Sequence, residues 1–375
     1  MFCWPNKKEK TKLLDHAIQV TGLHRKSITR TLKKGKLFIN NRKGSSGTKI
    51  LYPTDLLLKH IDYLWHSMER ISSKRMKEGF NDWLPYYREN DIDNRTKYLL
   101  QKMSISTLER FLKQLRTKST ITKGIASTSS ARYMKNKVPI NTLDSTVTRP
   151  GYTQADTVAH CGDKLIGEFI NSITVTDIFS GWTVNASIFT KTALEVKDAL
   201  ESIQKEIPFK LIAINTDSNV PVFNHFKKEK VVFTRSRPYK KNDNCYVRED
   251  TREQKNYTHV RELFGYQRID HLELKEIMND IYINYWNPLQ NYFLPTFKLK
   301  EKIIVGAKIK KSYGKPQTPY KRLMESVNLT EEDKEQLSLT KKRYNPFTLK
   351  KELEKKLSIF FTKLNELNKT KKEIA

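Results

Sequence analysis

Hydrophobic residues recur at helical spacing near the amino terminus. Four of them share one face of a helix expected over residues 9–20: Leu13, Leu14, Ala17 and Ile18. Gly22 ends this helix, and a second helix from Arg25 turns Ile28 and Leu32 inward. This is helix-turn-helix form, and four residues of the second helix would face outward: Arg25, Lys26, Thr29 and Arg30. Such residues suit phosphates and base edges in a major groove, although a solvated helical hairpin has the same pattern.

Helical spacing resumes after a basic connector. We predict one helix over residues 54–77 and a further helix that begins with a capping box from Ser106 to Glu109. A cluster of large apolar side chains stands between them: Phe80, Trp83, Leu84, Tyr86 and Tyr87. Because they lie at helical spacing among aliphatic residues, we expect core packing rather than base stacking. Residues 1–45 and 46–116 are therefore predicted to form two helical DNA-binding modules.

The pattern changes after a basic linker, residues 117–146, which is rich in serine, threonine and lysine. Three β-branched and aromatic runs then indicate antiparallel strands: residues 152–160, 169–176 and 182–189. A helix, a buried strand, a short strand and a second helix follow: residues 193–207, 209–217, 231–233 and 253–264. This order predicts an α/β RNase H-like core over residues 147–290, with flanking helices on a mixed five-stranded sheet. A basic region, residues 291–375, completes a multidomain chain.

The net charge of the chain indicates which class of molecule it binds. Among 375 residues, the formal net charge of +29 exceeds what solubility requires, so we expect a polyanion, and nucleic acid first. No apolar run is long enough to span a bilayer, so no membrane partner is expected. Three scattered cysteines form no metal knuckle or disulfide framework, and the start lacks the apolar region of a signal peptide. We therefore expect a reduced, cytoplasmic protein.

Three carboxylates fall at the places where such a core could bring them together. Asp156 lies on the first predicted strand, Asp217 at the end of the fourth, and Glu253 in the first turn of the last helix. Cleavage or transfer of a phosphodiester requires that the negative charge on the phosphate be neutralised. Two divalent ions held about 4 Å apart by carboxylates do this. Magnesium prefers such oxygen ligands. We predict that Asp156, Asp217 and Glu253 are both the catalytic and the metal-binding residues, with two Mg²⁺ or Mn²⁺ ions.

Several stretches resemble bacterial insertion-sequence transposases with a retroviral-integrase-type catalytic core. They are QADTVAHCG (154–162), TDIFSGW (176–182), FTRSRPYKKNDN (233–244), EQKNYTHVRELFGY (253–266) and WNPLQNYFLPTFKLKEK (286–302). The 35 residues between Asp217 and Glu253 match the spacing in that core, whose carboxylate triad is called DDE. The resemblance implies metal-dependent cleavage at a transposon end and strand transfer into target DNA, without a covalent enzyme intermediate.

The resemblance also implies partners. Double-stranded DNA would be bound as transposon ends and target by a homo-oligomer in the bacterial cytosol, in association with the nucleoid. Four basic residues of the loop before the last helix and of that helix would lie near the DNA: Arg237, Lys240, Lys241 and Lys255. The loop could equally be a solvated surface, and His259 could be a structural hydrogen-bonding residue.

Two segments depart from the family pattern. Residues 218–222 lack the residues usual after the second aspartate, and residues 248–252 resemble an insertion before the glutamate. If the register is shifted, Glu249 would replace Glu253. The alternative function is a catalytically degenerate relative that binds DNA without cutting it. A nuclease acting on RNA is disfavoured, because a helix-turn-helix suits grooves of duplex DNA.

The remaining candidates have structural interpretations. Asp177 in TDIFSGW is expected to cap a hairpin turn, and His160 and Cys161 lack a second ligand pair for zinc, so Cys161 is expected in the core. Nine basic residues and one acidic residue lie between Lys298 and Arg322, a segment expected to lie on DNA. The apolar stripe of a final helix after Pro346 is expected to pack on its own domain, a subunit contact being the other interpretation.

Overall fold

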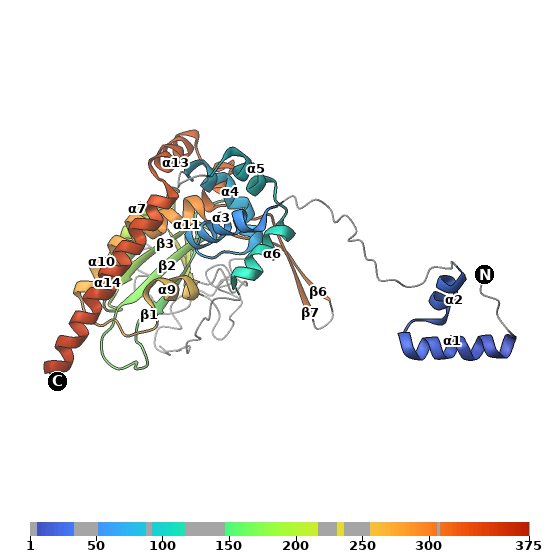
Figure 1. The fold of residues 1–375 in the computed structure, drawn as a ribbon. Coiled ribbons are helices and arrows are strands. Elements are labelled where there is room, and N and C mark those ends of the chain that lie inside the picture. Colours follow the sequence, from blue (N-terminus) through green and yellow to red (C-terminus); the bar gives the residue numbers. More distant parts are fainter. Residues whose placement is uncertain are drawn as a thin grey trace. The chain divides into compact units, whose positions relative to one another are not determined.

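The structure is a computed structural model that divides the chain into two units, Met1–Pro53 and Thr54–Ala375, labelled by element in Figure 1. It describes these residues: 6–33, 52–87, 92–116, 147–216, 231–235, 256–305 and 308–374.

The first unit contains the predicted pair of helices, α1 (Lys7–Thr21) and α2 (Arg25–Lys33). The Asn6 side chain caps α1 by accepting the Glu9 N–H at 3.0 Å. Gly22 ends α1 with a φ of 64°, a left-handed conformation that glycine adopts without a Cβ clash. The helix pair is confirmed, and DNA binding by it stays a prediction.

The second unit begins with four α-helices and a 3₁₀ turn: α3 (Thr54–Ser67), α4 (Ser73–Trp83), η1 (Leu84–Tyr86), α5 (Asn94–Lys102) and α6 (Ile105–Arg116). The single helix predicted over residues 54–77 is wrong. The chain turns at Glu69 and Arg70, whose φ angles are 57° and 51°. The predicted capping box is also displaced, because Ser104 Oγ accepts the Thr107 N–H at 3.1 Å before α6.

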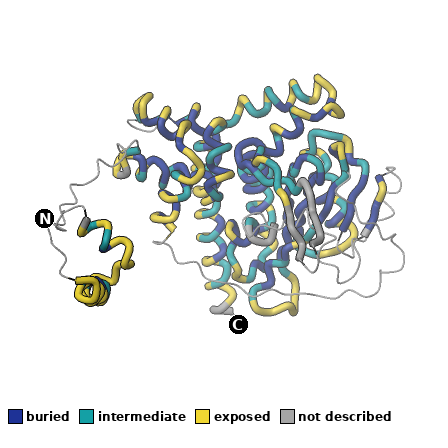
Figure 2. The backbone as a smooth tube through the Cα atoms, turned by 90° about the vertical axis from the view of Figure 1, so that its right-hand side faces the viewer, coloured by how far each residue is buried: buried dark blue, intermediate teal, exposed yellow. Residues whose placement is uncertain are grey.

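These helices pack on residues near the carboxyl terminus. Trp83 is fully buried, and its Nε1 donates to the Phe293 carbonyl at 2.9 Å. Its ring meets Phe347 edge-on, with centroids 5.1 Å apart. Asp82 pairs with Lys341 at 2.6 Å. The predicted core role of the aromatic cluster is confirmed for Trp83 and its buried neighbours, and Figure 2 shows buried residues on both these helices and the sheet.

The central sheet has five described strands: β1 (Tyr152–Ala159), β2 (Asn171–Asp177), β3 (Thr183–Ile188), β4 (Ala213–Thr216) and β5 (Val232–Arg235). Their order is β3-β2-β1-β4-β5. β2 runs antiparallel to β1 and β3, whereas β4 runs parallel to β1 and β5. The predicted mixed five-stranded sheet is confirmed, and this strand order is that of an RNase H-like core.

Helices cover the sheet and close its β3 edge. They are α7 (Ala193–Glu206), α9 (Asn256–Phe264), α10 (Glu273–Ile281), the π-helix η3 (Tyr282–Trp286) and α11 (Asn287–Phe293). Asn279, Asn287 and Asn291 accept backbone N–H groups from alternate residues of β3, at 2.7, 3.1 and 2.8 Å. Two turns of an α-helix take about 7.2 residues, whereas Asn287 follows Asn279 by eight. The wider turn of the π-helix accommodates the difference, so both side chains face β3. The edge strand is thereby paired with side chains.

The carboxyl-terminal part adds a hairpin and three helices: β6 (Leu299–Val305), β7 (Lys308–Tyr313), α12 (Pro319–Met324), α13 (Glu331–Arg343) and α14 (Pro346–Ile374). α14 runs alongside α10, where Lys356 pairs with Asp280 at 2.7 Å (Figure 1). Leu353, Phe360 and Leu364 of α14 are fully buried, so the predicted packing of this helix on its own domain is confirmed. None of the described helices is long and apolar enough to cross a membrane.

Candidate active site

Asp156 lies on β1, the central strand of the sheet. It is opposite Thr174 of β2, and its Oδ1 accepts the Thr157 N–H at 2.9 Å. On the other side of β1, β4 pairs in parallel and its last described residue, Thr216, is opposite Ala155. Asp217 follows Thr216 directly in the sequence and lies outside the described residues. In the described sheet, β4 therefore ends one residue before the position that would pair with Asp156.

A lysine from the loop between β3 and α7 contributes charge near Asp156. Burial lowers the pKa of Lys191, and the Asp156 carboxylate opposes that shift. Asp156 is half-buried, so it is partly accessible to solvent. An oxygen ligand at the centre of a sheet, partly open to solvent, has the chemistry that a divalent cation requires.

Helix α9 contacts the end of β1, the strand that carries Asp156. Side chains alternate along a strand, so His160 and Asp156 point to the same face. The His160 N–H still bonds to the Ile170 carbonyl at 2.9 Å, which continues the ladder past β1. The ring of Phe264, at the end of α9, meets His160 edge-on with centroids 5.9 Å apart. α9 is the helix that follows Glu253 in the sequence.

His160 belongs to a buried polar chain beneath α9. Its Nε2 and Ser172 Oγ share a hydrogen bond of 2.8 Å, and Ser172 Oγ and the Tyr282 hydroxyl share one of 2.7 Å. Among the described residues His160 Nδ1 has no partner, and burial, with the Arg261 charge, lowers the pKa of His160 to about 3. The imidazole is therefore neutral in the folded protein.

This depressed pKa predicts a loss of stability in mild acid. Below pH 6.5 the unfolded chain protonates His160 while the folded chain does not, so the free energy of unfolding falls as pH drops toward about 3. The slope from this residue is about 1.4 kcal/mol per pH unit. Urea unfolding between pH 5 and pH 7.5 should show a shallower slope in His160→Gln. Equal slopes in both proteins would contradict the assignment of the neutral form.

Asp177 has the structural role predicted from the sequence. Its Oδ2 accepts the Ser180 N–H and hydroxyl at 2.7 and 2.6 Å, and Oδ1 accepts the Gly151 N–H at 2.9 Å. Burial raises its pKa to about 6, against these hydrogen bonds and Lys298. The prediction that Asp177 caps this turn is confirmed, and Cys161 is buried as expected.

The other predicted catalytic and loop residues fall outside the described part of the chain: Asp217, Arg237, Lys240, Lys241, Glu249, Glu253 and Lys255. Within the described ranges, no three histidine, cysteine or acidic side chains group closely enough to hold a metal ion. The triad therefore stays a prediction, of which the structure describes Asp156.

The predicted DNA-contacting residues of α2 have unequal surroundings. Arg25 pairs with Asp15 of α1 at 2.7 Å, and Thr29 donates its hydroxyl to the Arg25 carbonyl at 2.8 Å. Lys26 and Arg30 are exposed. These two residues are therefore the more available for an external anion.

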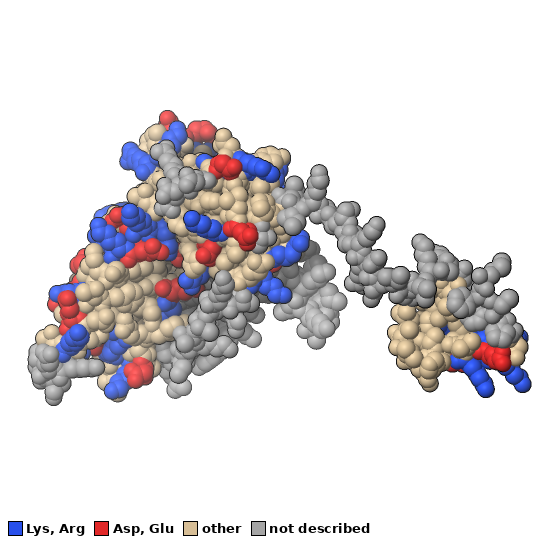
Figure 3. Space-filling view, in the orientation of Figure 1, with Lys and Arg blue, Asp and Glu red and all other residues tan. Residues whose placement is uncertain are grey.

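The basic segment from Lys298 to Arg322 has part of its charge turned inward. Lys298 Nζ donates to the Phe179 carbonyl at 2.6 Å, and burial lowers its pKa to about 8. Arg322 is buried and donates to the Ser180 carbonyl at 2.8 Å. On the face of the second unit drawn in Figure 3, basic and acidic side chains are interspersed. Net charge alone does not define a DNA path on this face.

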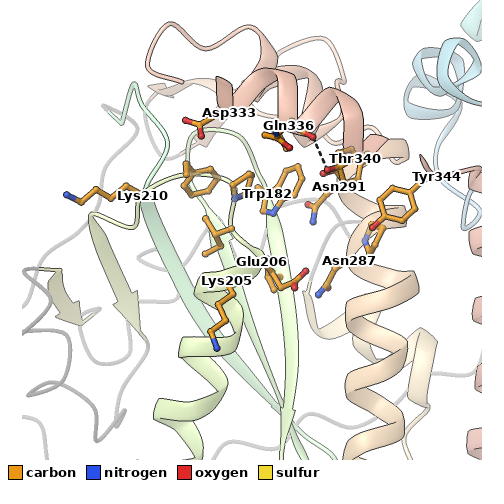
Figure 4. A pocket seen from close by; sticks show the side chains of 17 residues that line it. Trp182, Lys205, Glu206, Lys210, Asn287, Asn291, Asp333, Gln336, Thr340 and Tyr344 are labelled. Atoms are coloured by element: carbon orange, nitrogen blue, oxygen red, sulfur yellow. Dashed lines mark hydrogen bonds between the residues drawn. The ribbon is translucent and has the colours of Figure 1, made fainter. Parts of the chain in front are cut away.

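A cavity of about 640 Å³ lies away from Asp156. It is lined by residues from the end of α7, α11, α13 and the segments beside them, including Trp182, Glu206, Asn291 and Tyr344 (Figure 4). Neither β1 nor β4 lines it, so this cavity is separate from the carboxylate site. Burial raises the pKa of Glu206.

A protein of known sequence is similar to most of this chain. No family model matches the chain. The uncharacterized protein y4rM of Sinorhizobium fredii is 30% identical over 327 residues, which cover 84% of this chain and 89% of that protein. The chain belongs to the y4rM family. The match covers most of both proteins.

The solved structures similar to parts of this y4rM family member include an integrase core and a chain of an intasome. The catalytic core domain of BIV integrase is 16% identical, with a TM-score of 0.28, covering 47% of this chain and 95% of that one. A chain of the simian T-cell lymphotropic virus intasome in complex with PP2A regulatory subunit B56 gamma is 15% identical, with a TM-score of 0.24, covering 40% and 50%. At these TM-scores neither similarity supports a fold or a function, and the fold rests on the strand order.

Proposed function

We propose that this protein is a DDE-type DNA transposase, a polynucleotidyl transferase that cuts the ends of an insertion sequence and joins them to target DNA. The observation that carries the proposal is the placement of Asp156. It lies on the central strand of an RNase H-like sheet, beside the strand that leads into Asp217, and the end of its own strand contacts the helix that follows Glu253. The motif resemblance of the same residues supports the same reaction.

The proposed site would hold its metal ions through Asp156, Asp217 and Glu253. Bound there, two Mg²⁺ or Mn²⁺ ions would supply charge neutralisation at phosphorus and activation of the attacking oxygen. The protein's own contribution is rigidity. The pairing of β1 with β2 fixes the backbone of Asp156, and carboxylate ligands must be held within about 0.5 Å of a productive geometry.

Double-stranded DNA is the proposed substrate. The net charge of +29 favours a polyanion, and Lys26 and Arg30 of α2 are exposed and available for groove or phosphate contacts. Joining two element ends requires them to be held together, so a homo-oligomer on DNA is part of the proposal.

Strand cleavage and strand transfer on a labelled duplex carrying the element's own terminal sequence test the function. We expect cutting with Mg²⁺ or Mn²⁺ and none with EDTA. DNA binding measured in parallel separates the two candidate functions. Binding without cutting under every metal condition would contradict an active transposase and establish the degenerate, DNA-binding relative, which the unusual residues 218–222 and 248–252 favour.

The identity of the glutamate is a separate prediction. We expect Glu253→Gln to lower the cutting rate by on the order of 10³-fold, because it removes a charge that neutralises the metal ions, while Glu249→Gln leaves the rate unchanged. Both variants should bind the terminal duplex as the wild type does. Loss of cutting in Glu249→Gln alone would instead place the third carboxylate at Glu249.

A further inference from the structure

Arg261 is a buried arginine on the inner side of α9. It is 7% exposed, and its guanidinium donates to two backbone carbonyls, those of Ala159 on β1 and Gly265 just after α9. The same group lies over the Tyr266 ring, 5.4 Å from its centroid. One side chain therefore joins the helix, its end and the central strand.

Within the described strands, the sheet offers no partner to the carbonyl of Ala159. Adjacent residues of a strand direct their backbone groups to opposite edges, and the His160 N–H points to β2. The Ala159 carbonyl therefore faces the β4 side. Within the described strands β4 pairs with β1 only over Tyr152–Ala155, so Arg261 occupies the position that a further strand residue would take.

The last turn of α9 is fixed by a second contact. Phe264 packs edge-on against His160, Tyr282 and Phe360, at centroid distances of 5.9, 5.4 and 5.1 Å. His160 and Tyr282 are themselves joined through Ser172. Arg261 and Phe264 are three residues apart and lie on one face of the helix. Together these two contacts fix how α9 is rotated about its axis and how it is placed against the end of β1.

We propose that Arg261 is a positioning residue for DNA cutting, which fixes α9 against the end of β1, the strand that carries Asp156. This helix begins three residues after Glu253 in the sequence. This inference rests on the proposed function. Asp156 and Ala159 lie on the same strand, about 10 Å apart at three residues, and Arg261 ties α9 to that strand at Ala159. A displacement of about 1 Å at a catalytic group can lower a rate by about 10²-fold, so a side chain that never touches DNA can control the rate.

The test compares Arg261→Met and Arg261→Lys with a matched control, Arg268→Lys. Arg268 also donates to backbone carbonyls, those of Lys164, Ile166 and Glu168, but it organises the turn between β1 and β2 rather than α9. We expect Arg261→Met to cut about 10²-fold more slowly, with partial recovery in Arg261→Lys, which keeps the charge. The dissociation constant for the terminal duplex should stay within about twofold. Arg268→Lys should lower the melting temperature without a matching loss of rate per folded molecule.

Hydrogen exchange provides a measurement that does not depend on cutting. In Arg261→Met the amides of residues 256–264 should exchange faster than in the wild type, while those of β2 do not change. If the wild type cuts no DNA, the proposed function fails, and exchange still tests the docking of α9. Unchanged exchange in α9 would overturn the positioning role. So would cutting by Arg261→Met at the wild-type rate, or a rate loss in Arg261→Met no greater than that in Arg268→Lys at equal folded fraction.

Discussion

Asp156→Asn is expected to cut the terminal duplex at least about 10³-fold more slowly than the wild type at saturating Mg²⁺ or Mn²⁺. The substitution keeps the size of the side chain and its place on β1, but it removes the negative charge proposed to bind the metal ions. The fold and the affinity for DNA should not change. Single-turnover cleavage, with binding measured on the same duplex, checks both parts.

The control for this variant is Asp163→Asn. Asp163 is an exposed carboxylate in the turn after β1, seven residues further along the same segment. It should cut at the wild-type rate, because it is exposed and no described contact joins it to Asp156. Cutting by Asp156→Asn at a rate near that of Asp163→Asn would remove Asp156 from the triad and with it the basis for the proposed function.

Trp83→Ala is expected to lower the free energy of unfolding by about 4 kcal/mol. The side chain is fully buried, packs on Phe347 and Phe293, and donates its indole N–H to the Phe293 carbonyl. Truncation leaves a cavity and an unmatched carbonyl at the junction between α4 and α11. Urea unfolding followed by far-ultraviolet circular dichroism measures the change.

Tyr98→Ala provides the comparison, because Tyr98 lies on α5 with 57% of its surface exposed. We expect a change within about 0.5 kcal/mol. If Trp83→Ala unfolded the helices of residues 54–116 alone, and left the transition of the sheet in place, the two parts would be independently stable. A single weakened transition is the expected result, because the interface joins them.

The elements of the core were predictable from the sequence because their patterns are strong. β2 is buried along its whole length, and its β-branched residues gave a clear strand signal. The break between α3 and α4 gave none. Apolar spacing continues through Met68 and Ile71, both buried, while the turn is made by Glu69 and Arg70 in left-handed conformations without a glycine or proline.

The site was predictable only in part. Asp156 and Asp177 could be placed from their local motifs, and the cap made by Asp177 is confirmed. Arg261 was missed because a basic residue on a predicted helix suggests solvent or DNA. Its burial depends on a carbonyl 102 residues earlier in the chain. The apolar residues around it in HVRELF offered the available signal, since they place Arg261 on the inner face with Val260 and Phe264.

The junction at Trp83 also sets an order of events during synthesis. Its hydrogen-bond acceptor is 210 residues further along the chain, and the Pro295 carbonyl that receives Arg75 is 220 residues from its donor. A ribosome adding about 5–20 residues per second would take roughly 10 to 40 seconds to reach them. During that interval α4 is complete but lacks the surface on which it packs. The helical region thus reaches its final form only after the core has been translated, which delays full assembly until the chain is nearly finished.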